Sequence, residues 1–343
     1  MTEILKTIEL IEDKRQEKKV RHKLLDIVVI VLFAKLANAD DWEEVEIFAK
    51  SNEEFLRQYI GLENGIPSHD TMQRVMGSIA PEYMQGVYNK WHELVNSNEG
   101  ETLKKIICID GKTMRGNQSN GQKANHIVSA WCDMDVFCLG QKKVEEKSNE
   151  ITAIPQLLDA IQIKGSVITV DAMGTQTEIV EKIKQKHADY TLAVKENQKN
   201  LYREISEYFE DVELLKEIKC NNGYRITKEK SHSQIETREY YQCSKIGWMQ
   251  EKSRWKGIKS IGMICKTTEQ SGKQVTGRRY YISSLPLNVE LFARTVREHW
   301  SVEVMHWHLD VTFKEDANTT LDKTAAQNLN IINKWCLSIL LVS

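Results

Sequence analysis

Several features that this sequence lacks narrow its class. Its seven cysteines contain no Cys-x-x-Cys pair, which argues against a structural zinc site and predicts reduced, buried thiols. The only long apolar run near the start, residues 24–37, contains Asp26 and Lys35 and is too short to span a bilayer. No basic segment followed by a small-residue cleavage site precedes it. These absences predict a cytoplasmic protein without membrane spans.

An excess of charge of either sign is also missing. The formal net charge is −2, whereas a protein that grips DNA through many phosphates usually displays concentrated positive charge. Basic residues gather only locally, at 14–23, 104–105, 142–143 and 278–279. The global charge weakly opposes nucleic-acid binding and the local clusters weakly favour it. Any single cluster is more often a solvated surface, so charge alone does not decide.

The first hundred residues have a helical pattern. With 343 residues, 41% of them hydrophobic, the chain is an ordinary globular protein with room for two or three domains. Apolar residues recur at intervals of three to four over 24–36 and 42–48, and Ser68 is a candidate N-cap for a following helix. We predict a helical domain over residues 1–100. Its basic arm suits DNA binding, and a structural cap is the open alternative.

From about residue 103 the pattern changes to strands, and this part indicates an α/β fold. Short apolar strands are expected at 106–109, 127–131 and 136–139, followed by an alternation of helices and strands over 151–194. Alternation of this kind produces parallel strands with crossover helices, so we expect a mixed sheet with flanking helices. A β-rich insertion is predicted at about 213–285, a helix at 289–311, and a terminal helix at about 325–341. The second domain therefore spans residues 101–343.

Three acidic residues are candidates for a catalytic site. Asp110 and Asp171 each follow a buried apolar strand, and Glu303 lies on the predicted helix downstream. Two carboxylates on neighbouring strands repel each other unless a divalent cation lies between them. Mg²⁺ prefers oxygen ligands and keeps several waters, so a few carboxylates hold it and leave room for substrate oxygens. Asp, Asp and Glu in this order form a minimal metal-dependent phosphoryl-transfer site with Mg²⁺, or Mn²⁺ in its place.

Polar residues near these acids are candidate phosphate contacts. Five of these residues follow two of the strands, namely Lys112, Arg115, Lys195, Asn197 and Gln198. For these five, the alternative is that they are ordinary polar loop residues. His299 and His306 lie two helical turns apart and share a face with Glu303. Because Mg²⁺ favours oxygen, we expect these two histidines to contact substrate phosphate rather than the metal.

Longer motifs carry a family resemblance. They run in order over most of the chain and form a specific set, namely 109–116 (IDGKTMRG), 146–151 (EKSNEI), 171–176 (DAMGTQ), 194–198 (VKENQ), 279–285 (RYYISSL), 297–303 (REHWSVE), 306–307 (HW) and 309–313 (LDVTF). With these motifs, the chain resembles DDE transposases of the H-repeat-associated, ISAs-type insertion-sequence family. Residues 13–15 and 65–71 resemble the N-terminal domain associated with that family.

The resemblance implies a fold, an activity and partners. The implied fold is an RNase-H-like core with a β-rich insertion before the helix that carries Glu303. The implied activity is cut-and-paste DNA transposition, with Asp110, Asp171 and Glu303 as catalytic metal ligands and Arg297 among the DNA contacts. The implied partners are the terminal inverted repeats and the target DNA, bound by a homodimer.

The sequence also departs from the family pattern. Val296, His299 and Asp310 stand where related transposases often carry Tyr, Arg and Lys, and Val304 follows Glu303 where Asn is usual. The sequence ends at residues 341–343, where a further helical tail is expected. Two alternatives therefore remain: a metal-dependent nuclease without strand transfer, and a catalytically inactive DNA-binding remnant.

Overall fold

The structure is a computed structural model. It describes residues 2–16, 18, 20–95, 103–118, 121, 123–145, 148–231, 234–271 and 273–342. The predicted domain boundary at 100–101, Lys19 of the basic arm, the pair 146–147 and the final residue lie outside the described residues.

For most of the chain, the described helices and strands follow one another in the order that the sequence predicts. The α-helices are α1 (Thr2–Ile8), α2 (Leu24–Leu36), α3 (Trp42–Ser51), α4 (Glu53–Leu56), α5 (His69–Ser78), α6 (Pro81–Val95), α7 (Glu150–Ala160), α8 (Thr177–Gln185), α9 (Lys199–Glu210), α10 (Val212–Cys220), α11 (Val289–Glu298), α12 (Ser301–Val311) and α13 (Lys323–Val342). The strands are β1 (Ile106–Thr113), β2 (His126–Cys132), β3 (Phe137–Lys143), β4 (Val167–Val170), β5 (Asp189–Val194), β6 (Tyr224–Ser231), β7 (Gln234–Cys243), β8 (Ser260–Gln270) and β9 (Lys273–Ser283). Short 3-10 helices are η2 (Arg115–Asn117), η3 (Glu196–Gln198), η4 (Glu251–Arg254) and η5 (Glu315–Ala317).

Helix α2 is the centre of the N-terminal helices. Its sequence is apolar on all sides, and ten of its thirteen residues are buried. The neighbouring helices begin at side-chain caps: Ser68 accepts a hydrogen bond from the Thr71 amide and starts α5, which confirms the predicted cap. Lys35, though buried, donates to the carbonyl oxygen of Ala39.

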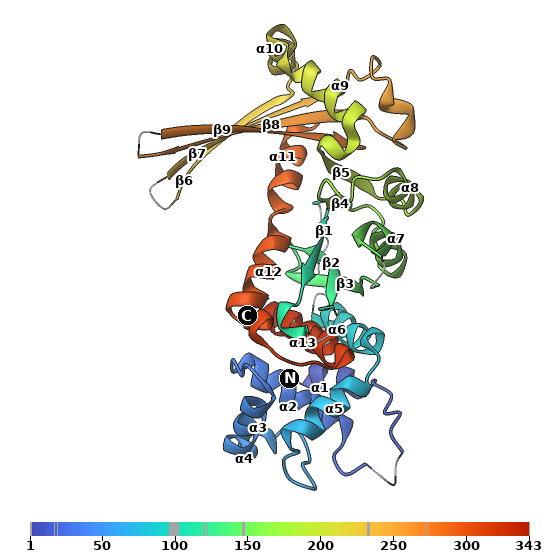
Figure 1. The fold of residues 1–343 in the computed structure, drawn as a ribbon, viewed down its shortest axis with the longest axis vertical. Coiled ribbons are helices and arrows are strands. Elements are labelled where there is room, and N and C mark those ends of the chain that lie inside the picture. The colour runs from blue at the N-terminus through green and yellow to red at the C-terminus, as the bar shows by residue number, and fades with distance from the viewer. Residues whose placement is uncertain are drawn as a thin grey trace.

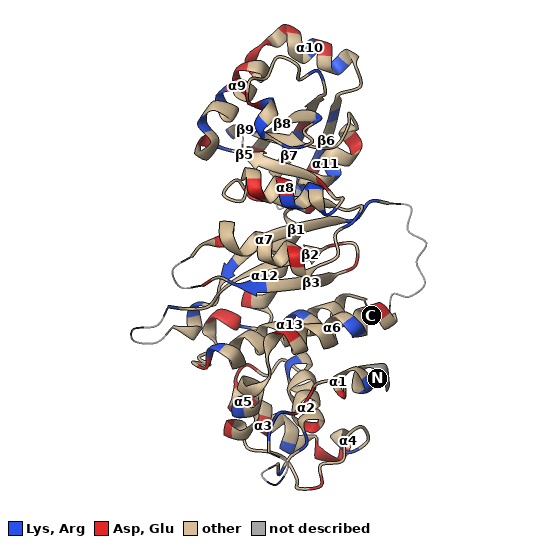
Figure 2. Cartoon of the chain, turned by 90° about the vertical axis from the view of Figure 1, so that its right-hand side faces the viewer, with Lys and Arg blue, Asp and Glu red and all other residues tan. Residues whose placement is uncertain are grey.

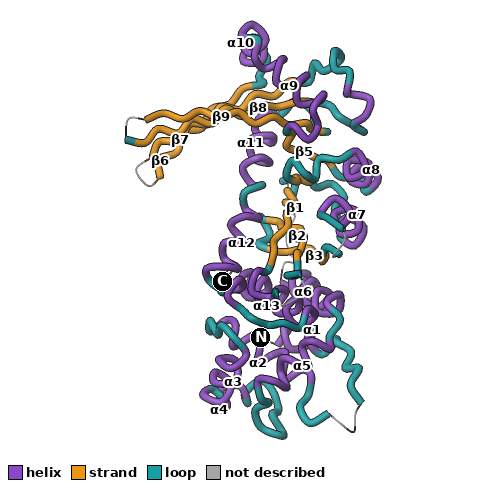
Figure 3. The backbone as a smooth tube through the Cα atoms, viewed as in Figure 1, coloured by secondary structure: helices purple, strands orange, loops and turns teal. Residues whose placement is uncertain are grey.

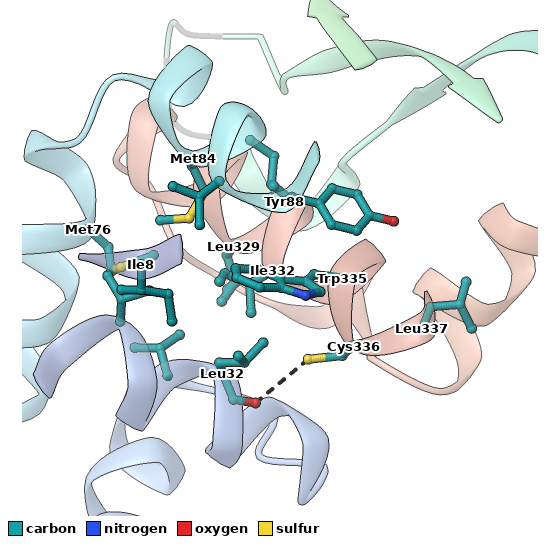
Figure 4. Close-up of a cluster of buried hydrophobic side chains, with 14 of the residues drawn as sticks. Ile8, Leu32, Met76, Met84, Tyr88, Leu329, Ile332, Trp335, Cys336 and Leu337 are labelled. Atoms are coloured by element: carbon teal, nitrogen blue, oxygen red, sulfur yellow. Dashed lines mark hydrogen bonds between the residues drawn. The ribbon is translucent and has the colours of Figure 1, made fainter. Parts of the chain in front are cut away.

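Helix α13 completes the N-terminal core, although it lies more than two hundred residues downstream. It packs against α2, α5 and α6, and Trp335, Ile332 and Leu329 enter the cluster around Leu32 and Met76 (Figure 4). Trp335 is fully buried, and each such side chain contributes about 1.5–3 kcal/mol. The N-terminal helices and the C-terminal helix therefore share one hydrophobic core.

The strands form one continuous mixed sheet. Its order is β3-β2-β1-β4-β5-β9-β8-β7-β6, with β1, β4 and β5 parallel and the other pairs antiparallel. The first five strands are the three-strand meander followed by crossover strands that the sequence predicts. This arrangement confirms the α/β, RNase-H-like fold class.

Helices cover both faces of the central strands. Helices α7 and α8 pack on one face, and α11, α12 and α13 lie on the other (Figure 1). Strands β6 to β9 extend sideways beyond the helices as a long arm (Figure 3). Helices α11 and α12 run end to end from the arm to α13, so the arm and the central sheet are linked by the segment that carries Glu303 (Figure 1).

Four boundaries differ from the sequence-based expectations. Strand β1 does not end at Asp110 but continues to Thr113, because β2 pairs with it over its length. The predicted β-rich insertion begins with a helix, α10, capped by Asp211. Its strands also extend the central sheet, since β9 pairs with β5, a pairing that the sequence did not predict. The expected single helix over 289–311 is interrupted between α11 and α12, at His299 and Trp300.

Other sequence-based expectations concern thiols, membranes and charge. Five of the seven cysteines are buried, as predicted, while Cys220 is exposed and Cys265 is intermediate. Within the described chain no helix is long and apolar enough to cross a membrane, as expected. Basic and acidic residues are interspersed over the whole length of the molecule (Figure 2).

Candidate active site

Two of the predicted acids lie side by side on neighbouring parallel strands. Ile109 of β1 is in register with Val170 of β4, so Asp110 and Asp171 each stand one residue beyond this pair. Asp171 lies in the turn after β4, where its carboxylate accepts a hydrogen bond from the Gly174 amide at 3.1 Å. The sheet thus brings together two carboxylates that are 61 residues apart in the sequence.

Glu303 approaches the same place from helix α12. Its side chain is exposed, and helix α12 packs against β1. Burial raises the pKa of Asp110 to about 7; a hydrogen bond from the Gly111 amide opposes this rise, and the charges of Glu150, Asp171 and Glu303 add to it. Asp171 and Glu303 are therefore both close enough for their charges to act on Asp110.

The three acids do not form a closed cage. Among the described residues, no group of three His, Cys, Asp or Glu side chains is already gathered tightly enough to hold a metal ion. Carboxylates repel one another at short range, which favours such a spread arrangement. The donor set nevertheless fits a hard divalent cation. Its atoms are carboxylate oxygens, and the charges of Glu150, Asp171 and Glu303 around Asp110 favour a cation there.

His306 and His299 line the site as neutral rings. His306 Nδ1 lies 3.6 Å from Asp110 Oδ2, and burial lowers the pKa of His306 to about 3. His299 Nδ1 lies 2.9 Å from the Thr169 hydroxyl, and burial lowers the pKa of His299 to about 4, against the charge of Asp171. Neither ring offers a positive charge to a phosphate at neutral pH, although each could still form a hydrogen bond.

Lys112 is occupied by carboxylates of its own chain. Its ammonium lies 2.7 Å from Asp310 and 3.1 Å from both Glu315 and Asp316, and only 9% of its side chain is exposed. Arg115 pairs loosely with Asp316 at 3.6 Å and is 82% exposed. Lys112 therefore fastens β1 to the end of α12, whereas Arg115 remains open to a ligand.

Of the residues after β5, two are hydrogen-bonded within the chain and one is exposed to solvent. Asn197 donates to the Ala172 carbonyl at 2.7 Å, and Gln198 donates to the Thr175 carbonyl at 2.9 Å. Both amides thus brace the turn that presents Asp171. Lys195, directly before them, is exposed. Arg297 is half-exposed and pairs with Glu229 at 3.3 Å.

The sequence did not single out Glu150 and His126 as part of the site. Glu150 is the first residue of α7, and its Oε1 lies 2.7 Å from His126 Nε2. A Cβ atom at Gly111 would lie 2.2 Å from Glu150 Oε1, so this close approach requires glycine. The sequence signals were the glycine after Asp110 and the acid at the helix start. Only the position of α7 against the sheet connects them.

Comparisons with known proteins show the family of the chain. The model of the family described as "Transposase DDE domain" matches residues 101–339, and the model described as "DDE_Tnp_1-associated" matches residues 5–92. Several relatives bear transposase names, including three proteins of Escherichia coli. The "H repeat-associated putative transposase YhhI" of Escherichia coli K12 is 38% identical over 99% of this chain and 90% of that protein. The "Putative transposase YncI" of E. coli O157:H7 is 39% identical over 98% and 87%. The "H repeat-associated putative transposase YbfD" of E. coli K12 is 40% identical over 71% and 94%.

The fold and the family match define a protein of the DDE class, a family of phosphoryl-transfer enzymes. The chain belongs to the DDE transposase family, with the associated N-terminal domain, and it is similar to H-repeat-associated members over nearly its full length. Members of this family typically act on DNA and use a divalent metal ion.

Proposed function

We propose that this protein is an insertion-sequence transposase that cleaves and transfers DNA strands with Mg²⁺, or with Mn²⁺ in its place. The observation that carries the proposal is the arrangement of Asp110 and Asp171 on adjacent parallel strands, with Glu303 near enough for its charge to add to the rise that burial causes in the pKa of Asp110. This constellation suits an in-line displacement at a phosphodiester.

The three acids share one role in the proposed mechanism. Asp110, Asp171 and Glu303 would hold the metal through their carboxylate oxygens. The bound metal would supply Lewis-acid activation of the attacking oxygen and stabilise the leaving oxygen. Asp110 is held rigidly within β1, while Glu303 reaches the sheet from a helix.

The remaining predicted residues divide into contacts and supports. We assign Arg115, Lys195 and Arg297, which are at least half-exposed and basic, to DNA phosphates. Lys112, Asn197 and Gln198 support the site through the bonds they already make. His299 and His306 would contact substrate as neutral hydrogen-bonding groups. The proposed DNA is the element's terminal inverted repeats and a target, bound by a homodimer.

The test is a strand-transfer assay on duplexes that carry the candidate element ends, with Mg²⁺ or Mn²⁺. Joined products support transposition. Cleavage without joining indicates a nuclease, and binding without cleavage indicates an inactive DNA-binding protein. Both of these results contradict the proposal.

The variants Asp110→Asn, Asp171→Asn and Glu303→Gln should each lose cleavage while they still bind DNA. Removal of a carboxylate takes away a metal ligand and also relieves repulsion from phosphates. Asp159→Asn is the matched control, because Asp159 is 60% exposed at the end of α7. Cleavage at the wild-type rate by any of the three variants would contradict the assigned roles.

A further inference from the structure

A basic groove lies where the arm meets the helix that leads to the active site. Strands β7, β8 and β9 form one wall, and α11 with Trp300 forms the other. The groove encloses about 260 Å³. No described residue that lines it is acidic, and five are basic: Arg238, Lys266, Arg278, Arg279 and Arg297.

Two glutamates beside the groove neutralise only part of this charge. Glu229 lies 2.9 Å from Arg238 and 3.3 Å from Arg297. Glu236 lies 2.7 Å from Arg238 and also pairs with Lys266. Three of the five basic side chains thus share two carboxylates. The groove therefore carries an excess of positive charge, although the net charge of the chain is −2.

Arg278 and Arg279 account for the unpaired part of this charge. Among the described residues neither has a carboxylate partner. Both side chains belong to exposed residues of β9. They are therefore free to meet an anionic ligand.

One end of the groove lies near the helix that carries Glu303. The Arg279 guanidinium lies 4.9 Å from the centre of the Trp300 ring, over its face. Trp300 immediately precedes α12, and Glu303 lies within the first turn of that helix. Arg279 is close enough for its charge to act on both His299 and Glu303. A polymer that occupied the groove would therefore lie near Glu303.

The floor of the groove is apolar and preformed. Tyr240, Ile264 and Tyr281 are buried there against Phe292 of α11. Trp300, at the end nearest the acids, is 37% exposed. Cations at the rim above an apolar and aromatic floor match a nucleic-acid strand, which has anionic phosphates on one side and apolar sugar and base surfaces on the other.

We propose that this groove seats the phosphate backbone of one strand of duplex DNA, next to the point of cleavage. The proposal rests on the proposed function, because it takes DNA as the substrate of the adjoining acids. It adds Arg238, Lys266, Arg278 and Arg279 to the DNA-binding surface. The arm thereby becomes a clamp that orients DNA, in addition to extending the sheet.

The test is DNA affinity as a function of salt. The probe is a labelled duplex of arbitrary sequence, measured by fluorescence anisotropy without divalent metal. The variant Lys266→Ala/Arg278→Ala removes two groove cations that lie away from the acids. Affinity should fall by about tenfold or more. The slope of log Kd against log salt should flatten by about two units, one for each lost phosphate contact.

Two matched variants separate charge from folding. Lys216→Ala/Lys245→Ala removes two exposed lysines that pair with glutamates of α10, outside the groove, and should keep the wild-type slope. Lys266→Arg/Arg278→Lys keeps both groove charges and should restore affinity. Thermal unfolding of each variant shows whether the arm is intact.

The possible outcomes distinguish the two proposals. If the wild type binds and cleaves DNA but the groove variant keeps its affinity and slope, the groove assignment is wrong and the proposed function stands. If the groove and control variants weaken binding equally, the effect is one of overall charge and the groove assignment is also wrong. If the wild type binds no DNA, both proposals are wrong.

Discussion

Replacing Asp110 with Asn should stabilise the protein at alkaline pH when a chelator is present. Burial, together with the charges of three neighbouring carboxylates, raises the pKa of Asp110 from 3.8 to about 7. One pKa unit corresponds to about 1.36 kcal/mol. A rise of about three units means that ionised Asp110 costs the folded state up to about 4 kcal/mol. Asn has no charge, and its side-chain oxygen still accepts the hydrogen bond from Gly111.

The sign of the effect follows from proton binding. Between pH 3.8 and about 7, the folded protein keeps a proton on Asp110 that the unfolded chain has lost. The free energy of unfolding of the wild type therefore falls as the pH rises through this window. The cost is absent below the window and complete above it. The advantage of Asp110→Asn should consequently be small near pH 4 and largest at pH 8.

The assay is the melting temperature, Tm, by calorimetry from pH 4 to 9 in a chelator. The difference between Asp110→Asn and wild type should grow to several degrees, at roughly 2–4 °C per kcal/mol. Asp159→Asn, an exposed carboxyl, should give a small difference over this range. Added Mg²⁺ should raise the Tm of the wild type more than that of Asp110→Asn, because binding stabilises the folded state. A constant difference between Asp110→Asn and wild type at all pH values would refute the reasoning.

Three further outcomes are expected. Gly111→Ala should unfold at a lower temperature and lose cleavage, because its Cβ would lie 2.2 Å from a carboxylate oxygen. Gly86→Ala on α6 is the control, because a Cβ there meets open space and the change should be neutral or stabilising. Equal Tm values for the two variants would contradict this prediction. Burial lowers the pKa of Lys334, so wild-type stability should rise with pH from neutrality toward 10, and Lys334→Met should lack this rise; parallel Tm curves would count against it. Arg21→Ala/Arg74→Ala, in a second basic pocket beside α5, should weaken DNA binding and flatten its salt slope, and an unchanged slope would assign the basic arm to solvated surface.

The aspartates were predictable because their positions follow from local patterns. The apolar strands that precede Asp110 and Asp171 are short and β-branched, and two parallel strands bring their following residues to one place. The cap at Ser68 and the start of α5 were predictable for the same reason, since the cap is a contact over three residues.

The salt bridges of Lys112 could not be predicted from the sequence. It follows Asp110 in a polar segment, which favours a phosphate contact, but its three carboxylate partners lie about two hundred residues downstream. The helix break at His299 and Trp300 was equally hidden, because both residues keep nearly helical backbone angles. Long-range pairing and small interruptions leave little trace in periodicity.

The shared core of α2 and α13 has a consequence for how the protein is made. The helices around Leu32 are translated about three hundred residues before Ile332 and Trp335, which cover them. During synthesis the apolar surface of α2 stays uncovered until a segment about three hundred residues downstream has been made. Contacts of such long sequence separation form slowly. The nascent chain should therefore depend on chaperones until α13 docks. An isolated fragment of residues 1–95 should aggregate rather than fold.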